Sequence, residues 1–127
     1  MRWDKYENFS EEEFKCQGAG CCNGSVDMDE DFIYKLQAIR TLLDAPITIT
    51  SGYRCEDHDW SLGGAGNHTT GRAVDVRVGL ENVHALIKWG IQHMTGIGIK
   101  MHGPIPSRFV HLDNLTGDMR PRIWSYK

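Results

Sequence analysis

The segment "NHTTGRAVDV", residues 67–76, contains a histidine and a carboxylate that could both bind a metal ion. His68 and Asp75 stand on either side of Gly71, seven positions apart. Imidazole nitrogens and carboxylate oxygens are common zinc ligands, and a catalytic zinc site uses three protein ligands and leaves one position open. A lone His–Asp pair is more often a surface hydrogen bond, because short motifs have many false matches. A metal site here requires a third ligand from elsewhere.

Residue alternation in two expected strands predicts that third ligand. In "AVDVRV", residues 73–78, the valines share one face, so Asp75 lies on the other. In "RFVHLD", residues 108–113, valine and leucine likewise share a face, and His111 lies opposite them. If the two strands are neighbours, Asp75 and His111 meet on the open face of the sheet, and the glycine turn brings His68 to the same point. We therefore predict an open zinc site formed by these three residues.

The surrounding pattern predicts how these residues are positioned. "FSEEEF", residues 9–14, has a capping box and a hydrophobic staple, so it is expected to begin a short helix. Asp27, followed by Glu30, is expected to open a longer helix. The apolar face of this helix comprises Phe32, Ile33, Leu36, Ile39, Leu42 and Leu43. Residues 83–94 show a second helical period.

The expected strands alternate with these helices only loosely. They are residues 47–50, 73–78, 96–100 and 108–113, with a last edge strand at 122–126. Residues 52–71 are rich in glycine and polar side chains and are expected to form a long functional loop. The fold class is therefore α+β, with a small, mainly antiparallel sheet and helices packed on one face.

Composition excludes several classes of protein. The chain has 127 residues, which fits a single domain over residues 1–127, and a formal net charge of −3 with both signs interspersed. It has no basic stripe for nucleic acid and no apolar run long enough to span a membrane. Its first residues show no apolar signal segment, so we expect synthesis in the cytoplasm. We also expect a monomer.

The motif "HTTGRAVD" resembles the H-x-x-G-x-A-x-D motif of the M15 zinc peptidases, the D-Ala-D-Ala carboxypeptidase group. That superfamily includes phage endolysins and the hedgehog amino-terminal domain. "EEFKC", "SGYRC", "GGAGNHTTGRAVDV", "GIGI", "FVHLD" and a late tryptophan follow in the order of the phage and bacterial branch. The resemblance implies a hedgehog-type peptidase fold and a zinc peptidase acting on peptidoglycan stem or cross-link peptides. Such an enzyme would reach the cell wall after phage-mediated release or in a virion.

The resemblance also implies roles for individual residues. His68, Asp75 and His111 correspond to the zinc ligands, and Arg54 of "SGYR" corresponds to the residue that binds a substrate carboxylate. A guanidinium group suits this task because it can form two parallel hydrogen bonds with a carboxylate. Its neighbours are candidates to line the cleft; these are Ser51 and Tyr53.

Two departures from the family pattern affect catalysis and specificity. Relatives often read G-G-A-K-N-S-Q-H where this chain reads "GGAGNH", so a substrate-contacting serine is missing. Relatives also place a general base two or three residues before the last histidine ligand, where this chain has Phe109 and Arg108. Asp113 is the nearest substitute, about 6 to 7 Å along the strand from His111. It could accept the proton or orient a zinc ligand, and His102 is a weaker alternative.

The cysteines allow three interpretations. The chain has four, Cys16, Cys21, Cys22 and Cys55, and His58 follows the last of them closely. They could form a bridge, hold a second, structural metal ion, or remain as buried free thiols. The family resemblance places "FKC" and "YRC" close together.

Two functions from different classes fit these observations. The first is a zinc peptidase for cell-wall peptides, which Arg54 favours. The second is a cell-wall binding module that keeps the fold and the metal with little or no catalysis. The missing upstream base favours this second function.

Overall fold

A five-stranded sheet with the strand order β1-β2-β4-β3-β5 forms the centre of the computed structural model, which describes residues 1–127. The strands are β1 (Thr48–Ser51), β2 (Ala73–Arg77), β3 (Gly96–Lys100), β4 (Phe109–Asp113) and β5 (Arg122–Ser125). Neighbouring strands are antiparallel, except that β3 and β5 are parallel. The parallel pair arises because residues 114–121 lead from the end of β4 past β3, so that β5 pairs with the edge of β3 that faces away from β4.

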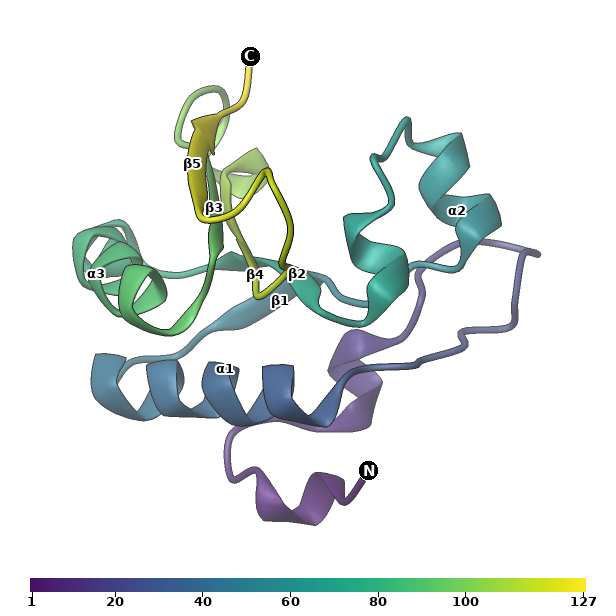
Figure 1. Cartoon of the computed structure of the whole chain (residues 1–127), viewed down its shortest axis with the longest axis horizontal. Helices are drawn as coiled ribbons and strands as arrows, with labels where there is room; N and C mark the ends of the chain where they lie inside the picture. Colours follow the sequence, from purple (N-terminus) through teal and green to yellow (C-terminus); the bar gives the residue numbers. More distant parts are fainter.

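Two helices cover one face of this sheet (Figure 1). They are α1 (Glu30–Leu43) and α3 (Val83–His93), which also contact each other. Their apolar faces pack against the inward-facing residues of the central strands, which are Val74, Val76, Val110 and Leu112. All four of these are at most 1 % exposed, so the alternation in the sequence assigned the core face correctly. The α+β class and the covering of one sheet face are confirmed.

The amino-terminal segment closes the lower part of the core. It has two short 3-10 helices, η1 (Trp3–Lys5) and η2 (Glu11–Phe14). The predicted capping box of η2 is present, with the Ser10 amide donating to Glu13 Oε2 at 2.7 Å. The predicted cap of α1 at Asp27 is wrong by two residues, because the Asp29 side chain accepts the hydrogen bond from the Phe32 amide at 3.0 Å.

The segment 52–71 is not the unstructured loop that its glycines suggested. It contains the helix α2 (Glu56–Ser61) and the 3-10 helix η3 (Asn67–Thr70). Both elements are too short for hydrophobic periodicity to become visible. Acidic residues in the first turn of α2 were the available signal, since they stabilise the amino-terminal end of a helix. Two further 3-10 turns, η4 (Leu80–Asn82) and η5 (Ile105–Ser107), lie on the connections around α3 and before β4.

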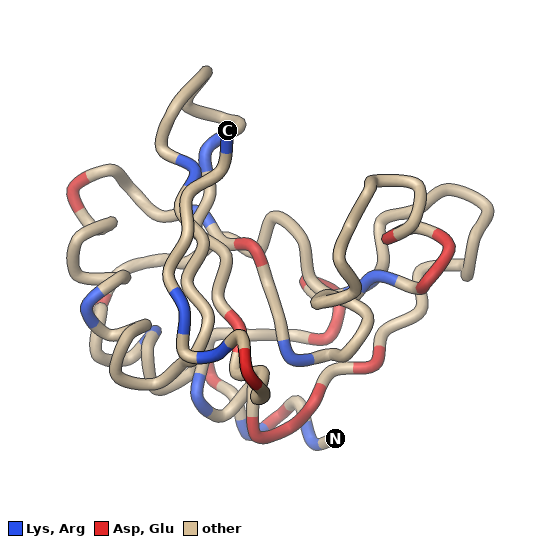
Figure 2. The backbone as a smooth tube through the Cα atoms, turned by 45° about the horizontal axis from the view of Figure 1, so that its top comes forward, with Lys and Arg blue, Asp and Glu red and all other residues tan.

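Charged residues of both signs are found in most parts of the fold, separated by stretches without charge such as residues 16–26 and 89–99 (Figure 2). This distribution agrees with the small net charge of the sequence and gives no extended basic face of the kind that binds nucleic acid. None of the helices combines the length and the apolar character needed to cross a membrane.

Candidate metal centre

The register of β2 and β4 brings two of the predicted ligands together. Asp75 and His111 are direct cross-strand partners, on the face of the sheet opposite to the core. His111 Nδ1 lies 3.1 Å from Asp75 Oδ1. The predicted meeting of these two residues therefore follows from the strand pairing itself, which backbone hydrogen bonds hold in place.

The third predicted ligand arrives from η3. His68 Nε2 lies 3.4 Å from Asp75 Oδ1. Gly71, with φ 73°, ends η3 and leads the chain into β2. A side chain at Gly71 would lie 2.1 Å from the Asp27 carbonyl oxygen, so glycine is required both for the backbone conformation and for the close approach of the segment before α1.

The spacing of the three ligand atoms suits a small metal ion. They all lie within 4.8 Å of one another. Zinc–ligand distances of about 2.0–2.2 Å place tetrahedral nitrogen and oxygen ligands roughly 3.3–3.6 Å apart. The separations of Asp75 Oδ1 from His111 Nδ1 and from His68 Nε2, 3.1 and 3.4 Å, are close to this range. Two histidines and one carboxylate also leave a fourth position open, as in catalytic zinc sites.

The second nitrogen of each imidazole has a partner of its own. His68 Nδ1 is 2.9 Å from the Gly52 carbonyl oxygen, and His111 Nε2 is 2.7 Å from Asp113 Oδ2. Such partners fix the tautomer and the orientation of a metal-binding imidazole. Both rings therefore present their remaining nitrogen toward Asp75.

The electrostatic environment favours the charged forms of Asp75 and His111. Burial alone would raise the pKa of Asp75, but its hydrogen bonds with His111 and His68 hold that pKa well below its usual range. Burial alone would lower the pKa of His111, but the carboxylates of Asp113 and Asp75 outweigh burial and raise it. A metal ion at this point would replace the proton that the buried imidazole otherwise shares with Asp75.

Asp113 lies on the side of His111 that faces away from Asp75. It is fully buried, and both of its oxygens are engaged. Arg120 binds it in a two-pronged contact, with Nε 2.9 Å from Oδ1 and Nη2 2.8 Å from Oδ2. Of the two roles that the sequence left open for Asp113, this geometry favours orientation of His111. It does not bring the carboxylate to the open side of the site, where a proton acceptor would act.

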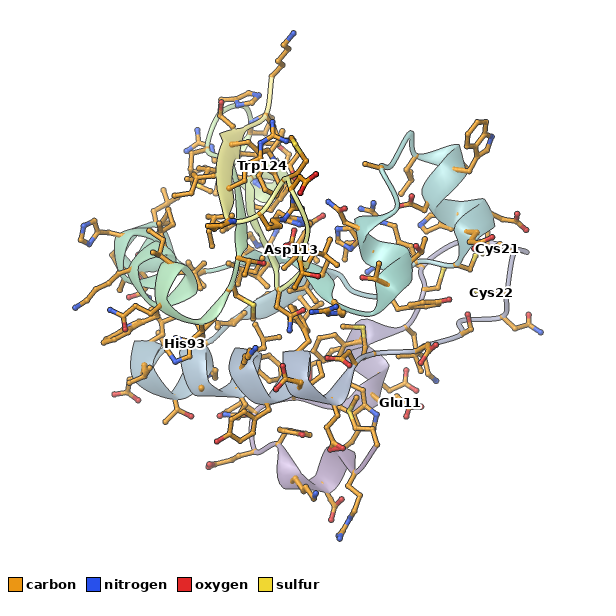
Figure 3. All side chains as sticks on the ribbon, in the orientation of Figure 1. Glu11, Cys21, Cys22, His93, Asp113 and Trp124 are labelled. Atoms are coloured by element: carbon orange, nitrogen blue, oxygen red, sulfur yellow. The ribbon has the colours of Figure 1, made fainter.

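A cleft of about 570 Å³ opens over the three ligands. One wall comes from α2 and the residues after it, and the other comes from β4 and the carboxy-terminal segment (Figure 1). Its lining includes Arg54, Asp59, Asn67, Arg122, Trp124 and Tyr126 in addition to the ligands. In Figure 3 Trp124 and Asp113 both lie at the strands that form the second wall.

The residues predicted to bind substrate are only partly brought to this cleft. Arg54 lines it and donates from Nη1 to Asp59 Oδ1 at 3.2 Å and from Nη2 to Asp75 Oδ2 at 3.5 Å. Ser51 does not line it and instead accepts a hydrogen bond from Arg54 Nε at 3.1 Å. Tyr53 packs against the core, and the exposed His102 lies outside the cleft lining.

Several residues of the site were not predicted from the sequence. Asp59 belongs to α2, which was taken for loop, and Arg120 lies in a connection with no periodic pattern. Arg122 and Trp124 were assigned to an edge strand, with no signal for the side they face. Their common feature becomes visible only in the folded chain, where five of the six buried polar or charged side chains belong to this site or contact it; these are Asp59, His68, Asp75, His111 and Asp113.

The four cysteines converge at a second point. Their sulfur atoms lie within 4.8 Å of one another, and none forms a disulfide. His58, which follows Cys55 closely in the sequence and was a possible further ligand, is not part of this group. In Figure 3 Cys21 and Cys22 lie beside α2, well apart from Asp113 and Trp124.

An open set of two imidazoles and one carboxylate, at the base of a cleft in an α+β fold, is typical of metal-dependent hydrolases. The sequence matches the Peptidase M15 family over residues 7–113, and the chain belongs to that family. This confirms the resemblance drawn from the motifs. The chain is therefore a peptidase of a zinc-dependent family whose members act on peptidoglycan-type peptides. No curated protein matches the sequence significantly.

Proposed function

We propose that this chain hydrolyses peptide bonds involving D-amino acids in peptidoglycan stem or cross-link peptides, with a single catalytic zinc ion bound by His68, Asp75 and His111. The observation that carries the proposal is the convergence of these three ligands at the base of an open cleft, with both imidazoles held by partners of their own. When bound, zinc would polarise the scissile carbonyl and lower the pKa of a bound water to about 7.

The cleft offers cationic groups for a peptide that bears a carboxylate. Arg54 lies next to the proposed ligand Asp75, and its guanidinium has more N–H groups than the three it uses with protein partners. Arg122 is exposed on the rim, with its guanidinium carbon 5.6 Å from the Trp124 ring centre. Both suit the terminal or side-chain carboxylates of stem peptides.

Asp113 acts in this proposal as a positioning residue. Its carboxylate holds His111 through Nε2, while Arg120 holds the carboxylate in turn. This chain of contacts keeps the His111 ring oriented toward the metal and increases the basicity of the imidazole as a ligand.

A binding module is the second candidate. The cleft lining contains two carboxylates, Asp75 and Asp59, and the first is a proposed zinc ligand. The oxygens of Asp59 accept hydrogen bonds from Arg54 Nη1 at 3.2 Å and from the Gly66 amide at 3.0 Å. These contacts hold Asp59, and apart from the proposed ligand Asp75 no other carboxylate lines the cleft, which favours binding with slow or no hydrolysis.

Release of new amino groups from purified peptidoglycan separates the two candidates. The peptidase predicts release that a chelator abolishes and added zinc restores, with mass spectrometry of the products identifying the bond that is cut. Products lacking a terminal residue indicate a carboxypeptidase, and internally cut stems indicate an endopeptidase. Binding to peptidoglycan without release, at any zinc concentration, would support the module and reject the peptidase. Access to the cell wall by phage-mediated release or from a virion, and action as a monomer, belong to the same proposal.

A further inference from the structure

The cysteine cluster has the dimensions of a coordination sphere. Cys16 Sγ lies 3.9 Å from Cys21 Sγ and 3.8 Å from Cys55 Sγ, and Cys21 Sγ lies 3.7 Å from Cys22 Sγ. Zinc–sulfur bonds of about 2.3 Å place tetrahedral sulfur ligands about 3.8 Å apart. A disulfide would instead join two sulfurs at about 2.05 Å. These three separations therefore match the edges of a metal-centred tetrahedron, and all four sulfurs lie within 4.8 Å of one another.

We propose that Cys16, Cys21, Cys22 and Cys55 together bind a structural zinc ion as four thiolates. The four thiol protons are released to solvent when the zinc–sulfur bonds form, and no oxidation occurs. Four sulfur ligands complete the coordination of zinc, so this site has no open position for a substrate or a water.

The segment that carries three of these cysteines needs such a cross-link. Residues 15–29 form no helix or strand. Within residues 16–25 one backbone hydrogen bond, from the Cys16 amide to the Ser25 carbonyl at 2.8 Å, closes the loop. Loops longer than about 12–15 residues without secondary structure are uncommon in compact domains. A metal ion bound to Cys16, Cys21 and Cys22 would offset the entropy lost when this loop is ordered.

The surroundings of the sulfurs suit thiolates. The Cys55 amide lies 3.5 Å from Cys16 Sγ, and the His58 amide lies 3.4 Å from Cys55 Sγ, so both N–H groups donate to sulfur. A side chain at Gly18 would come within 2.5 Å of Cys21 Sγ and 2.8 Å of the His58 ring. The loop therefore wraps closely around the cluster, and His58 contributes its backbone and its packing.

The proposed centre also adjoins one wall of the cleft. Cys55 follows Arg54 directly and caps α2, and Asp59 of the same helix binds Arg54. We assign to the four-cysteine centre the positioning of Arg54 and Asp59. This positioning role rests on the proposed function of the cleft, whereas the metal site itself does not.

The first test uses a protein in which the proposed zinc site at His68, Asp75 and His111 has been disrupted. The full-length His68→Ala/His111→Ala protein is purified, its zinc is measured by elemental mass spectrometry, and its metal-free form is titrated with Co²⁺. We expect about one tightly bound zinc per chain. We also expect the strong sulfur-to-cobalt charge-transfer absorption of a tetrahedral four-thiolate site. Absence of stoichiometric metal together with absence of this absorption would overturn the proposal.

A second measurement tests the proposal without the double variant, in case that variant does not fold. Native wild-type protein is treated with an alkylating reagent, and modified cysteines are counted by mass spectrometry before and after zinc is removed by acid and chelator. We expect all four cysteines to be protected before removal and modified after it. Immediate modification of all four, or cysteines already joined in disulfides, would overturn the proposal. Neither readout depends on peptidase activity, so failure of the proposed function would leave them unchanged.

Discussion

The two clusters of potential metal ligands in this protein differ in chemistry and in the elements that carry them. His68, Asp75 and His111 offer two nitrogens and one oxygen, and two of these ligands lie on paired strands of the sheet. The second cluster offers four sulfurs and lies in an irregular loop and at the start of α2. Three ligands beside a cleft leave room for a substrate, whereas four sulfurs leave none.

This difference predicts which of the two sites needs a bound metal ion to keep its structure. The strand pairing of Asp75 with His111 is held by backbone hydrogen bonds, so the histidine site exists before an ion binds. The cysteine loop has few backbone hydrogen bonds of its own, so an ion bound there is expected to contribute directly to folding. Removal of the first ion should therefore abolish activity and leave the fold intact. Removal of the second should lower stability, and it should reduce activity only through the displacement of Arg54 and Asp59.

The largest expected effect is on the histidine site. His111→Ala should reduce peptide release to the level of the chelated wild-type protein, because one of three ligands is lost. The zinc content should fall by one ion per chain, with the cysteine-bound ion retained. Peptide release and elemental analysis measure the two outcomes. The exposed His84→Ala provides the matched control and should behave as wild type in both. Full activity of the His111→Ala protein would remove this residue from the site.

Disruption of the cysteine cluster should have the converse effect. Cys22→Ser should lower the melting temperature by about 5–10 °C and make residues 17–24 sensitive to proteases. Calorimetry and limited proteolysis measure these changes. The exposed Ala19→Ser in the same loop serves as the control. An unchanged melting temperature and zinc content in the Cys22→Ser protein would show that the comparison between the two clusters is wrong.

Substitution of Asp113 tests how much its contact with His111 contributes to zinc binding. Asp113→Asn should weaken zinc binding by about 10–100-fold, because the partner of His111 Nε2 loses its charge. Excess zinc should then restore the rate. Zinc titration of the peptidase activity measures both effects, and the exposed Asp118→Asn is the control. A loss in kcat of about 10²–10⁴-fold that zinc does not rescue would instead identify Asp113 as the proton acceptor.

Arg54 lies between the two clusters and should have the smallest effect. It precedes Cys55 in the chain and contacts Asp75. Arg54→Lys should raise KM about tenfold for peptides ending in a carboxylate, since lysine cannot make the two-pronged contact. Arg122→Lys on the rim is the matched comparison. A larger effect of Arg122→Lys, measured by steady-state kinetics, would assign carboxylate binding to the rim residue.

The part of the histidine site that lies on strands could be predicted from the sequence, because strand geometry determines where those side chains lie. Alternation placed Asp75 and His111 on the face opposite the valines, and the pairing of β2 with β4 then brought them together. The helical period likewise predicted five of the six residues on the apolar face of α1 correctly, whereas Leu42 is exposed. In both cases a regular backbone converts sequence spacing into spatial position.

The remaining features depend on contacts without a regular spacing. The pairing of Asp113 with Arg120 joins a strand to an irregular connection, and the four cysteines meet through a loop. The helix α2 was missed because six residues are too few to show a period. The parallel pairing of β5 with β3 depends on the path of the preceding loop, which no local pattern specifies.

The most direct test of the central proposal follows metal content and activity together during chelation. Purified protein is incubated with a chelator, and zinc content and peptide release from peptidoglycan are measured in the same samples over time. Activity should disappear with the first ion to leave, while the cysteines remain protected from alkylation, and one added equivalent of zinc should restore it. Peptide release that continues after this ion has left, or that falls only when the cysteines become reactive, would contradict a catalytic zinc bound by His68, Asp75 and His111.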